Sequence, residues 1–344
     1  MMRLFFALLL LLPAGNNSWE KISVATSASL RGLSIVDENV IWASGTDGTI
    51  LRTTDAGKNW SVIKVPGAED QDFRGIHAFD QNTAVIVSAG KAEEGKARIY
   101  RTTDAGQNWK IVDQEKAEGI FFDAIAFWDR NHGIVLSDPV GGKFALFTSD
   151  DAGSSWKQVP SGGIPPALAN EGAFAASNSC ITVEGSRNAW FVTGGAKLAR
   201  VFHSSDRGRT WTVADTPLHP ANSSSGLFSI AFRDARHGVA VGGDYAHPEK
   251  SDLPNVLTTD DGGKTWRLSD PTEPPGVYFS SVAYPSVKSL GELATVGIEG
   301  QFFKPANGSW ARQNSGNLNT IAFTRSGQGF AIGAKGLVLR QNQR

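Results

Sequence analysis

The chain of 344 residues has a single cysteine, two methionines and four tyrosines, and only 19% of its residues are charged. One cysteine, Cys180, excludes an intrachain disulfide framework and any zinc or iron–sulfur site built from several cysteines. The formal net charge of −1 argues against a nucleic-acid partner. Hydrophobic residues make up 40% of the chain, which is enough to fill a core. We therefore expect an ordered protein with no metal site and no cofactor.

Long apolar runs are also scarce, and the longest one stands at the start of the chain. Nine apolar residues, 4–12, follow Arg3 and precede Pro13-Ala14-Gly15. This pattern is typical of a secretory signal peptide, and the run is shorter than the roughly 20 residues that a membrane-spanning helix needs. No cysteine follows the run, which argues against a lipid anchor. We expect a signal peptide at residues 1–17 and an exported, periplasmic or secreted mature protein, residues 18–344, without a membrane span.

What the chain has in abundance is a repeated octet, [Ser/Thr]-x-Asp-x-Gly-x-x-Trp, which occurs five times. Its defining residues are Asp55, Gly57 and Trp60; Asp104, Gly106 and Trp109; Asp151, Gly153 and Trp156; Asp206, Gly208 and Trp211; and Asp261, Gly263 and Trp266. A shortened sixth copy ends at Trp310. Successive tryptophans are 49, 47, 55, 55 and 44 residues apart, which is the size of a four-stranded propeller blade.

Seven short apolar segments lie between the octets, and each alternates large and small residues as the inner strand of a blade does. The seventh unit ends after its third strand, and the segment around Trp19, 41 residues before Trp60, matches a fourth strand. The sequence therefore predicts an all-β fold: a seven-bladed β-propeller of four-stranded blades whose last blade is closed by the N-terminal strand. Residues 18–344 are expected to form this single domain.

The octet itself is interpreted as structural. Its glycine supplies a positive φ, its Asp and Ser/Thr side chains bond turn amides, and its tryptophan is buried between blades. Octets on separate blades point their carboxylates away from one another, so they are not expected to act on one substrate.

Functional residues are expected on the face opposite the octet turns, because loops on a rigid scaffold often carry the ligand site. The candidate ligand-binding residues on that face are Arg31, Arg74, Asp123, Asp138, Tyr245 and His247. The weak catalytic candidates are Asp123, Asp138, Glu171 and Asp244, since glycoside hydrolysis needs paired carboxylates. Each has a structural alternative: the arginines pair with neighbouring carboxylates, and the acids stabilise turns. His247 lacks a second ligand at metal-binding spacing.

The octet resembles the Asp-box, or BNR repeat, which occurs in sialidases, sortilin-type propellers and the photosystem II stability/assembly factor family. Seven such blades behind a signal peptide are most similar to that last family and its bacterial relatives, over residues 18–344. The resemblance implies a lumenal or periplasmic protein that holds a newly made membrane subunit.

Two functions remain open at this point. The first is a binding scaffold, a monomer that grips a protein or peptide segment, such as part of a membrane protein, without catalysis. The alternative is a carbohydrate-active propeller, either a glycoside hydrolase or a lectin with a glycan ligand. A sialidase is disfavoured because the segment Phe73-Arg74-Gly75-Ile76 lacks the proline of an Arg-Ile-Pro segment.

Overall fold

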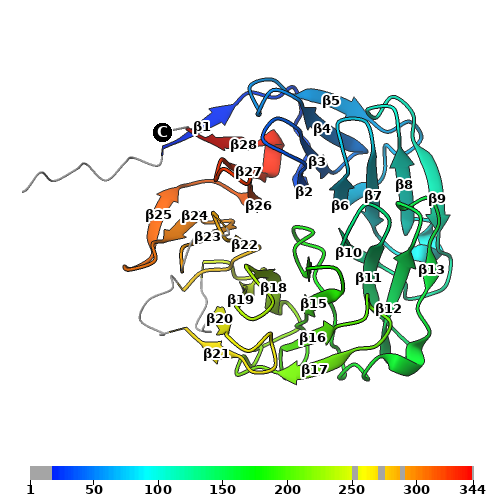
Figure 1. The fold of residues 1–344 in the computed structure, drawn as a ribbon, viewed down its shortest axis with the longest axis vertical. Helices are drawn as coiled ribbons and strands as arrows, with labels where there is room; N and C mark the ends of the chain where they lie inside the picture. Colours follow the sequence, from blue (N-terminus) through cyan, green and yellow to red (C-terminus); the bar gives the residue numbers. More distant parts are fainter. Residues whose placement is uncertain (1–17, 250–254, 270–275, 287–290, 343–344) are drawn as a thin grey trace, which may run out of the picture.

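A computed structural model describes residues 18–249, 255–269, 276–286 and 291–342, which form seven four-stranded sheets around a central axis (Figure 1). Six sheets follow chain order from the innermost strand outwards, and the seventh has the order β26-β27-β28-β1. All pairings between neighbouring strands are antiparallel, so the predicted seven-bladed propeller is confirmed. The expected signal peptide, residues 1–17, lies outside the described residues.

The strands of blades one to three are β2 (Leu30–Ile35), β3 (Ile41–Gly45), β4 (Thr49–Thr53) and β5 (Ser61–Lys64); β6 (Asp72–Ala78), β7 (Ala84–Ala89), β8 (Arg98–Thr102) and β9 (Lys110–Gln114); and β10 (Phe122–Phe127), β11 (Gly133–Val140), β12 (Lys143–Ser149) and β13 (Lys157–Gln158). Those of blades four and five are β14 (Ile181–Glu184), β15 (Asn188–Val192), β16 (Arg200–Ser204) and β17 (Thr212–Asp215); and β18 (Ser225–Phe232), β19 (Gly238–Asp244), β20 (Val256–Thr259) and β21 (Arg267–Leu268). Those of blades six and seven are β22 (Ser281–Ala283), β23 (Leu293–Gly297), β24 (Gly300–Lys304) and β25 (Ala311–Asn314); and β26 (Leu318–Phe323), β27 (Gly329–Gly333), β28 (Val338–Gln341) and β1 (Trp19–Ile22). Helical structure in the described ranges is limited to three short 3-10 turns: η1 (Ala92–Glu94), η2 (Ser161–Gly163) and η3 (Ala334–Gly336).

Strand β1 closes the ring from the N-terminal side. It is the outermost strand of blade seven and pairs with β28, with Trp19 opposite Gln341 and Ile22 opposite Val338. Figure 1 shows β1 and β28 side by side in this blade. The pairing covers the edge of β28 and gives blade seven a fourth, outermost strand like that of the other six blades.

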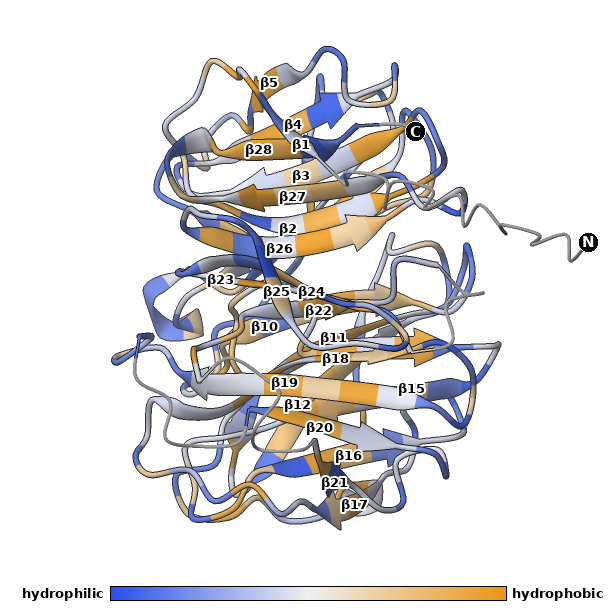
Figure 2. Ribbon diagram, turned by 90° about the vertical axis from the view of Figure 1, so that its left-hand side faces the viewer, coloured by the Kyte–Doolittle hydropathy of each residue, from blue (hydrophilic) through white to orange (hydrophobic). Residues whose placement is uncertain are grey.

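The alternating strand directions define two faces of the propeller. In Figure 2 the arrows of β2 and β3 point in opposite directions, so successive connections lie on opposite faces. We call the face that carries the octet turns the Asp-box face. The other face, formed by the loops after the second and fourth strands, is called the cavity face. In the described part of the chain, no helix is long and apolar enough to cross a membrane.

The octet turns use the same hydrogen bonds in all five full copies, as blade four illustrates. Asp206 accepts bonds from the Ser204 hydroxyl (2.8 Å), the Thr210 amide (2.9 Å) and the Thr210 hydroxyl (2.7 Å), and the Ser204 oxygen accepts the Gly208 amide (2.9 Å). Burial acts to raise the pKa of Asp206, but these bonds outweigh it and lower the pKa below its ordinary value. The carboxylate therefore stabilises the turn that the sequence assigns to it.

The backbone of this turn explains why its fifth position is glycine. Gly208 has φ +76°, and a Cβ there would lie 2.7 Å from Cδ1 of Ile134 in blade three. The residue before it, Arg207, also has a positive φ of 62°, a feature that the sequence analysis did not anticipate. Any other residue at position 208 would strain the backbone, and its Cβ would also push blades three and four apart.

Replacing the octet carboxylate tests this account of the turn. Asp206→Ala should lower the free energy of unfolding by about 2 kcal/mol, because it leaves several turn donors without their charged acceptor. Asp150, an exposed residue in the second position of its octet, supplies the control, and Asp150→Ala should change stability by less than about 0.5 kcal/mol. Urea unfolding of both variants measures the difference, and equal losses would contradict the assignment.

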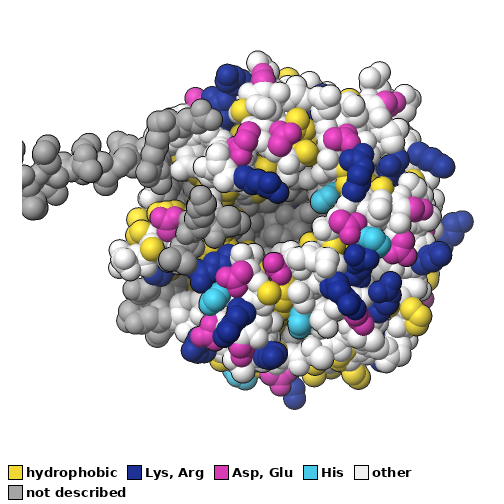
Figure 3. All heavy atoms as spheres, viewed as in Figure 1, with side chains coloured by type: hydrophobic (Ala, Val, Ile, Leu, Met, Phe, Trp, Pro, Cys, Tyr) yellow, Lys and Arg dark blue, Asp and Glu magenta, His cyan; other side chains and the backbone are white. Residues whose placement is uncertain are grey.

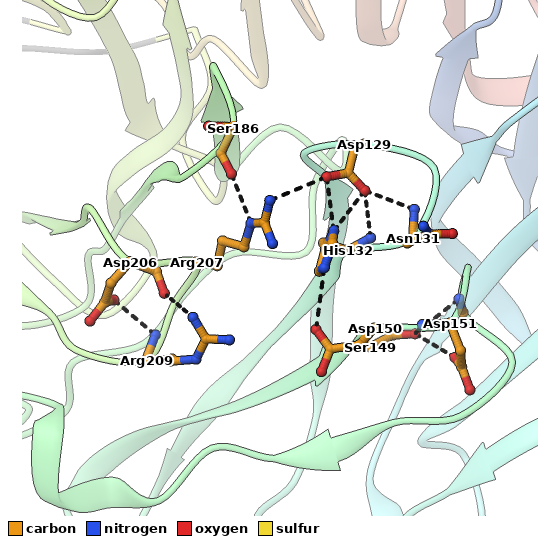
Figure 4. Close-up of polar contacts among 11 residues, drawn as sticks. Asp129, Asn131, His132, Ser149, Asp150, Asp151, Ser186, Asp206, Arg207 and Arg209 are labelled. Carbon is orange, nitrogen blue, oxygen red and sulfur yellow. Dashed lines mark hydrogen bonds and ion pairs between the residues drawn. The ribbon is translucent and has the colours of Figure 1, made fainter.

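The Asp-box face is rich in charges that are paired with one another. Viewed from that side, Figure 3 shows acidic and basic side chains interspersed around a central hollow. In Figure 4, Arg207 of blade four donates to the Ser186 carbonyl (2.9 Å) and reaches Asp129 of blade three (3.5 Å), while His132 lies between Asp129 and Asp150. The contact between Arg207 and Asp129 links blades three and four on this face.

Candidate functional site

The inner strands of five blades share a β-bulge. A β-bulge interrupts the pairing at the start of β2, β6, β10, β18 and β26, and each bulge leaves one residue outside the strand register. The five bulged residues are Arg31, Arg74, Asp123, Phe228 and Asn319. Bulges often redirect a side chain next to a functional site, and here all five residues line one cavity.

That cavity has a volume of about 610 Å³ and lies at the channel mouth on the cavity face. Its lining comes from loops and strand ends of all seven blades, from Ser29 in the segment before β2 to Ala334 after β27. Because each blade contributes a different side chain, the wall of the cavity is chemically asymmetric.

The floor of the cavity is a segment that crosses the channel. Residues 172–179, which precede β14 and are called the channel segment, hydrogen-bond to several other blades. The side chain of Asn178 donates to the Ile76 carbonyl (3.2 Å) and accepts the Ile125 amide (2.8 Å). The Ser177 hydroxyl donates to the Ser280 carbonyl (2.7 Å). These bonds connect blades two, three and six through the centre of the ring.

One side of the cavity is aromatic. Phe174 of the channel segment stacks on Phe228 with ring centroids 4.0 Å apart, and Tyr278 meets Phe228 edge-on at 4.8 Å. Tyr245 completes this aromatic wall at its rim, where it is 54% exposed. Because these aromatic side chains pack against one another, they form a preorganised apolar surface, and a ligand that covers it orders few further side chains.

Two arginines also line the cavity, and they differ in how they are bonded. Arg74 is paired, since its Nε contacts Asp72 at 2.7 Å and its Nη1 donates to the Ala175 carbonyl at 2.9 Å. Arg31 has no ion pair among the described residues; its one side-chain bond, to Asn319, is 3.4 Å long. Burial and then the charge of Arg74 lower the pKa of Arg31 from its ordinary value. The positive charge of Arg31 is therefore available to a ligand.

Two carboxyl groups complete the lining. Asp123 is 1% exposed, and neither of its carboxylate oxygens has a hydrogen-bond partner within the described residues. Burial raises the pKa of Asp123 well above its ordinary value; Asp138 adds to this shift and Arg74 opposes it. Asp138 accepts the Ala173 amide at 3.0 Å, yet burial still raises the pKa of its carboxyl to about 6.

The other predicted site residues lie outside the cavity lining. The buried Glu171 carboxylate accepts bonds from Thr193 (2.7 Å), the Leu168 amide (2.8 Å) and Arg200. Asp244 holds its own loop through Asn222 (2.8 Å), Ser224 (2.5 Å) and His247 (3.1 Å), and these bonds depress its pKa despite the opposing effect of burial. The structure thus brings Arg31, Arg74, Asp123, Asp138 and Tyr245 together at one cavity, and leaves Glu171, Asp244 and His247 in loop scaffolding.

Sequence reasoning missed four of the five aromatic residues that line the cavity: Phe121, Phe174, Phe228 and Tyr278. The sequence did contain a signal for Phe228, because this residue occupies the same position in its inner strand as Arg31, Arg74 and Asp123 occupy in theirs. Phe174 offered no such signal, since its position depends on the path of the channel segment across the ring.

The raised pKa of Asp138 predicts a stability difference that depends on pH. Asp138→Asn keeps an acceptor for the Ala173 amide but removes the ionisable group. A carboxyl whose folded pKa is raised destabilises the fold progressively as pH rises from about 4 through about 6. The variant should therefore match the wild type at pH 4 and be more stable at pH 8, by at most about 3 kcal/mol. Urea unfolding at pH 4, 6 and 8 measures this; a difference independent of pH would contradict it.

These features define a seven-bladed β-propeller with a chemically asymmetric cavity on the face opposite its octet turns. The family model described as photosynthesis system II assembly factor YCF48 matches residues 8–123. The chain is 26% identical over 343 residues to the photosystem II assembly lipoprotein Ycf48 of Picosynechococcus sp., covering 94% of this chain and 87% of that one. It therefore resembles the photosystem II assembly factor family, as the sequence analysis expected.

Solved structures show the same fold. A structure titled YCF48 bound to D1 peptide has a TM-score of 0.65 and 19% identity, covering 95% of this chain and 98% of that chain. YCF48 from Cyanidioschyzon merolae has a TM-score of 0.67 and 17% identity, covering 94% and 99% of the two chains.

Proposed function

We propose that this protein is an exported binding scaffold that holds a segment of a protein partner in the cavity on its cavity face. The observation that carries the proposal is the lining of that cavity, which combines the aromatic wall with Arg31, a cation that has no ion pair among the described residues. A peptide segment offers both an apolar side chain for the rings and a carboxylate or carbonyl groups for the guanidinium. The cavity volume of about 610 Å³ is in the range of pockets that take a few residues or a small ligand.

The relatives support a protein partner over a glycan. One solved structure of YCF48, by its title, holds a D1 peptide, and the curated relative is named for photosystem assembly. A glycoside hydrolase needs two accessible carboxyl groups across a scissile bond. Here Glu171 and Asp244 are engaged in loop hydrogen bonds and do not line the cavity. We propose a segment of an exported or membrane protein as the ligand and the periplasm or an equivalent compartment as the location.

Photocrosslinking from the cavity rim tests this proposal. Tyr245→benzoylphenylalanine places a reactive group at an exposed position of the cavity, and Ile111→benzoylphenylalanine, at a site 43% exposed on the outer strand β9, is the matched control. Illumination in an extract of exported and membrane proteins should give a discrete protein adduct from position 245 and not from 111. Adducts of equal yield and pattern from both positions, or glycan adducts alone, would overturn the proposal.

A further inference from the structure

Among the described residues that line the cavity, Asp123 has a carboxyl group whose bonding capacity the protein leaves unused. Asp123 is the bulged residue of β10, so the strand pairing leaves it outside the sheet and turns it towards the cavity. Both of its carboxylate oxygens lack hydrogen-bond partners among the described residues, although the residue is 1% exposed. A buried carboxyl without partners costs free energy, and such a cost at the wall of a cavity points to a ligand.

A second carboxyl faces the same place. Asp138, at the end of β11, uses one oxygen to accept the Ala173 amide, which fixes the side chain against the channel segment. The charged and titratable groups that face the pair are Arg74 from β6 and the fully buried thiol of Cys180. Arg74 is already paired with Asp72, so its charge only partly offsets the two acids.

We propose that Asp123 and Asp138 form a subsite for a primary ammonium group, such as the side chain of a lysine in the bound segment. An ammonium is a compact charge with three donors, which suits two adjacent carboxyl groups better than a planar guanidinium does. A metal ion is a poorer fit, because no group of three or more His, Cys, Asp or Glu side chains gathers at one point within the described residues.

This subsite makes the cavity bipolar. The Arg31 guanidinium can donate to an anionic or carbonyl group, the acid pair can accept an ammonium group, and the aromatic wall can cover apolar surface. Such an arrangement fixes the direction of a bound segment, because reversing the segment brings like charges together. The origin of the amine rests on the proposed function, whereas the subsite itself is defined by the two carboxyl groups.

Titration calorimetry with n-butylammonium chloride, which carries a lysine-like stem, tests the subsite directly. The wild type should bind it weakly, and either Asp123→Asn or Asp138→Asn should weaken binding about tenfold through loss of a charge-assisted bond. n-Butanol, which has the stem without the charge, should not show this dependence. Asp113→Asn is the matched control: burial raises the pKa of Asp113 to about 6, but Asp113 lies on β9, outside the cavity lining.

Proton release gives a readout that a purely structural role would not affect. Because the pKa of Asp123 is raised, the ammonium should displace a proton as it binds near pH 7, and affinity should increase from pH 5 to pH 8. Asp123→Asn should abolish that release. Equal binding by the wild type and both cavity variants, or no detectable binding by the wild type, would overturn the proposal. If Asp123→Asn does not fold, Asp138→Asn still tests whether the affinity for n-butylammonium depends on the acid pair.

Peptides then identify the source of the amine. An acetylated lysine methylamide tests the side chain, and an alanine dipeptide with a free N-terminus tests the terminal amine. Competition of either one with n-butylammonium assigns the source. Failure of all amines to bind, together with a crosslinked protein at position 245, would refute the ammonium subsite while leaving the proposed function intact.

Discussion

A variant that lacks residues 18–24 should lose cooperative unfolding, or fail to accumulate as a monomeric folded protein. These residues contain β1, whose four paired positions complete blade seven. The deletion also removes Trp19, which packs edge-on against Phe323 with ring centroids 6.3 Å apart, and the ion pair between Glu20 and Arg340. Loss of a packed tryptophan alone costs about 3 kcal/mol or more, which is a large part of a typical stability of about 5–15 kcal/mol.

The effect is expected to be large because the seven blades form a closed ring. Each blade is covered by a neighbour on both sides, and blade seven joins the two ends of the chain. Without β1, β28 becomes an open edge available to other chains, so aggregation should accompany the loss of stability. Thermal unfolding and size-exclusion chromatography measure both effects. Glu20→Gln, which keeps the strand but removes the ion pair, is the control and should cost less than about 1 kcal/mol. A truncated chain with an unchanged melting temperature would contradict this role of β1.

The fold was predictable from the sequence because its signals are local and repeated. The octet fixes the turn between the third and fourth strands of a blade, and its spacing fixes the blade size. Even closure was readable, since the segment around Trp19 matches the strands that follow Trp60 and Trp109. In the structure the tryptophan itself precedes most of these fourth strands: β5 starts at Ser61 and β9 at Lys110.

The cavity was predictable only in part, for a reason that lies in its construction. Arg31, Arg74 and Asp123 stand at the start of recognisable inner strands, so periodicity alone brings them to one channel mouth. The channel segment follows no repeat. Its bonds to Ile76 and Ser280 join positions 102 and 103 residues apart, and its bond to Ile125 joins positions 53 residues apart. No local pattern predicts such contacts, and the aromatic wall depends on them through Phe174.

The carboxyl groups of the cavity differ from those of the loops in how many hydrogen bonds they accept. Asp123 and Asp138 have raised pKa values because burial is not balanced by hydrogen bonds, whereas Asp244 has a lowered one because its loop supplies several donors. The residue type is identical, so the sequence could not separate the two groups. Polar groups that weaken the fold while lining a cavity are the ones that we expect to contact a ligand.

Glu171 provides the sharpest contrast, and Glu171→Gln should be among the most destabilising single substitutions in the chain. The carboxylate is buried against the guanidinium of Arg200, which is itself buried, and it also accepts the Thr193 hydroxyl and the Leu168 amide. Removing one partner of a buried ion pair leaves the other charge uncompensated, which costs about 3–5 kcal/mol. The loss should appear in urea unfolding at neutral pH.

Two further variants separate this structural role from a role in binding. Arg130→Met removes an exposed ion pair with Asp80, 2.9 Å long, and should cost less than about 1 kcal/mol. Adding Arg200→Met to Glu171→Gln removes the stranded charge, so the double variant should regain part of the stability that the single variant loses. If Glu171→Gln left stability unchanged but abolished crosslinking from position 245, the carboxylate would act on the ligand. Because its bonds hold together the loop that leads into the channel segment, we expect both properties to be lost together.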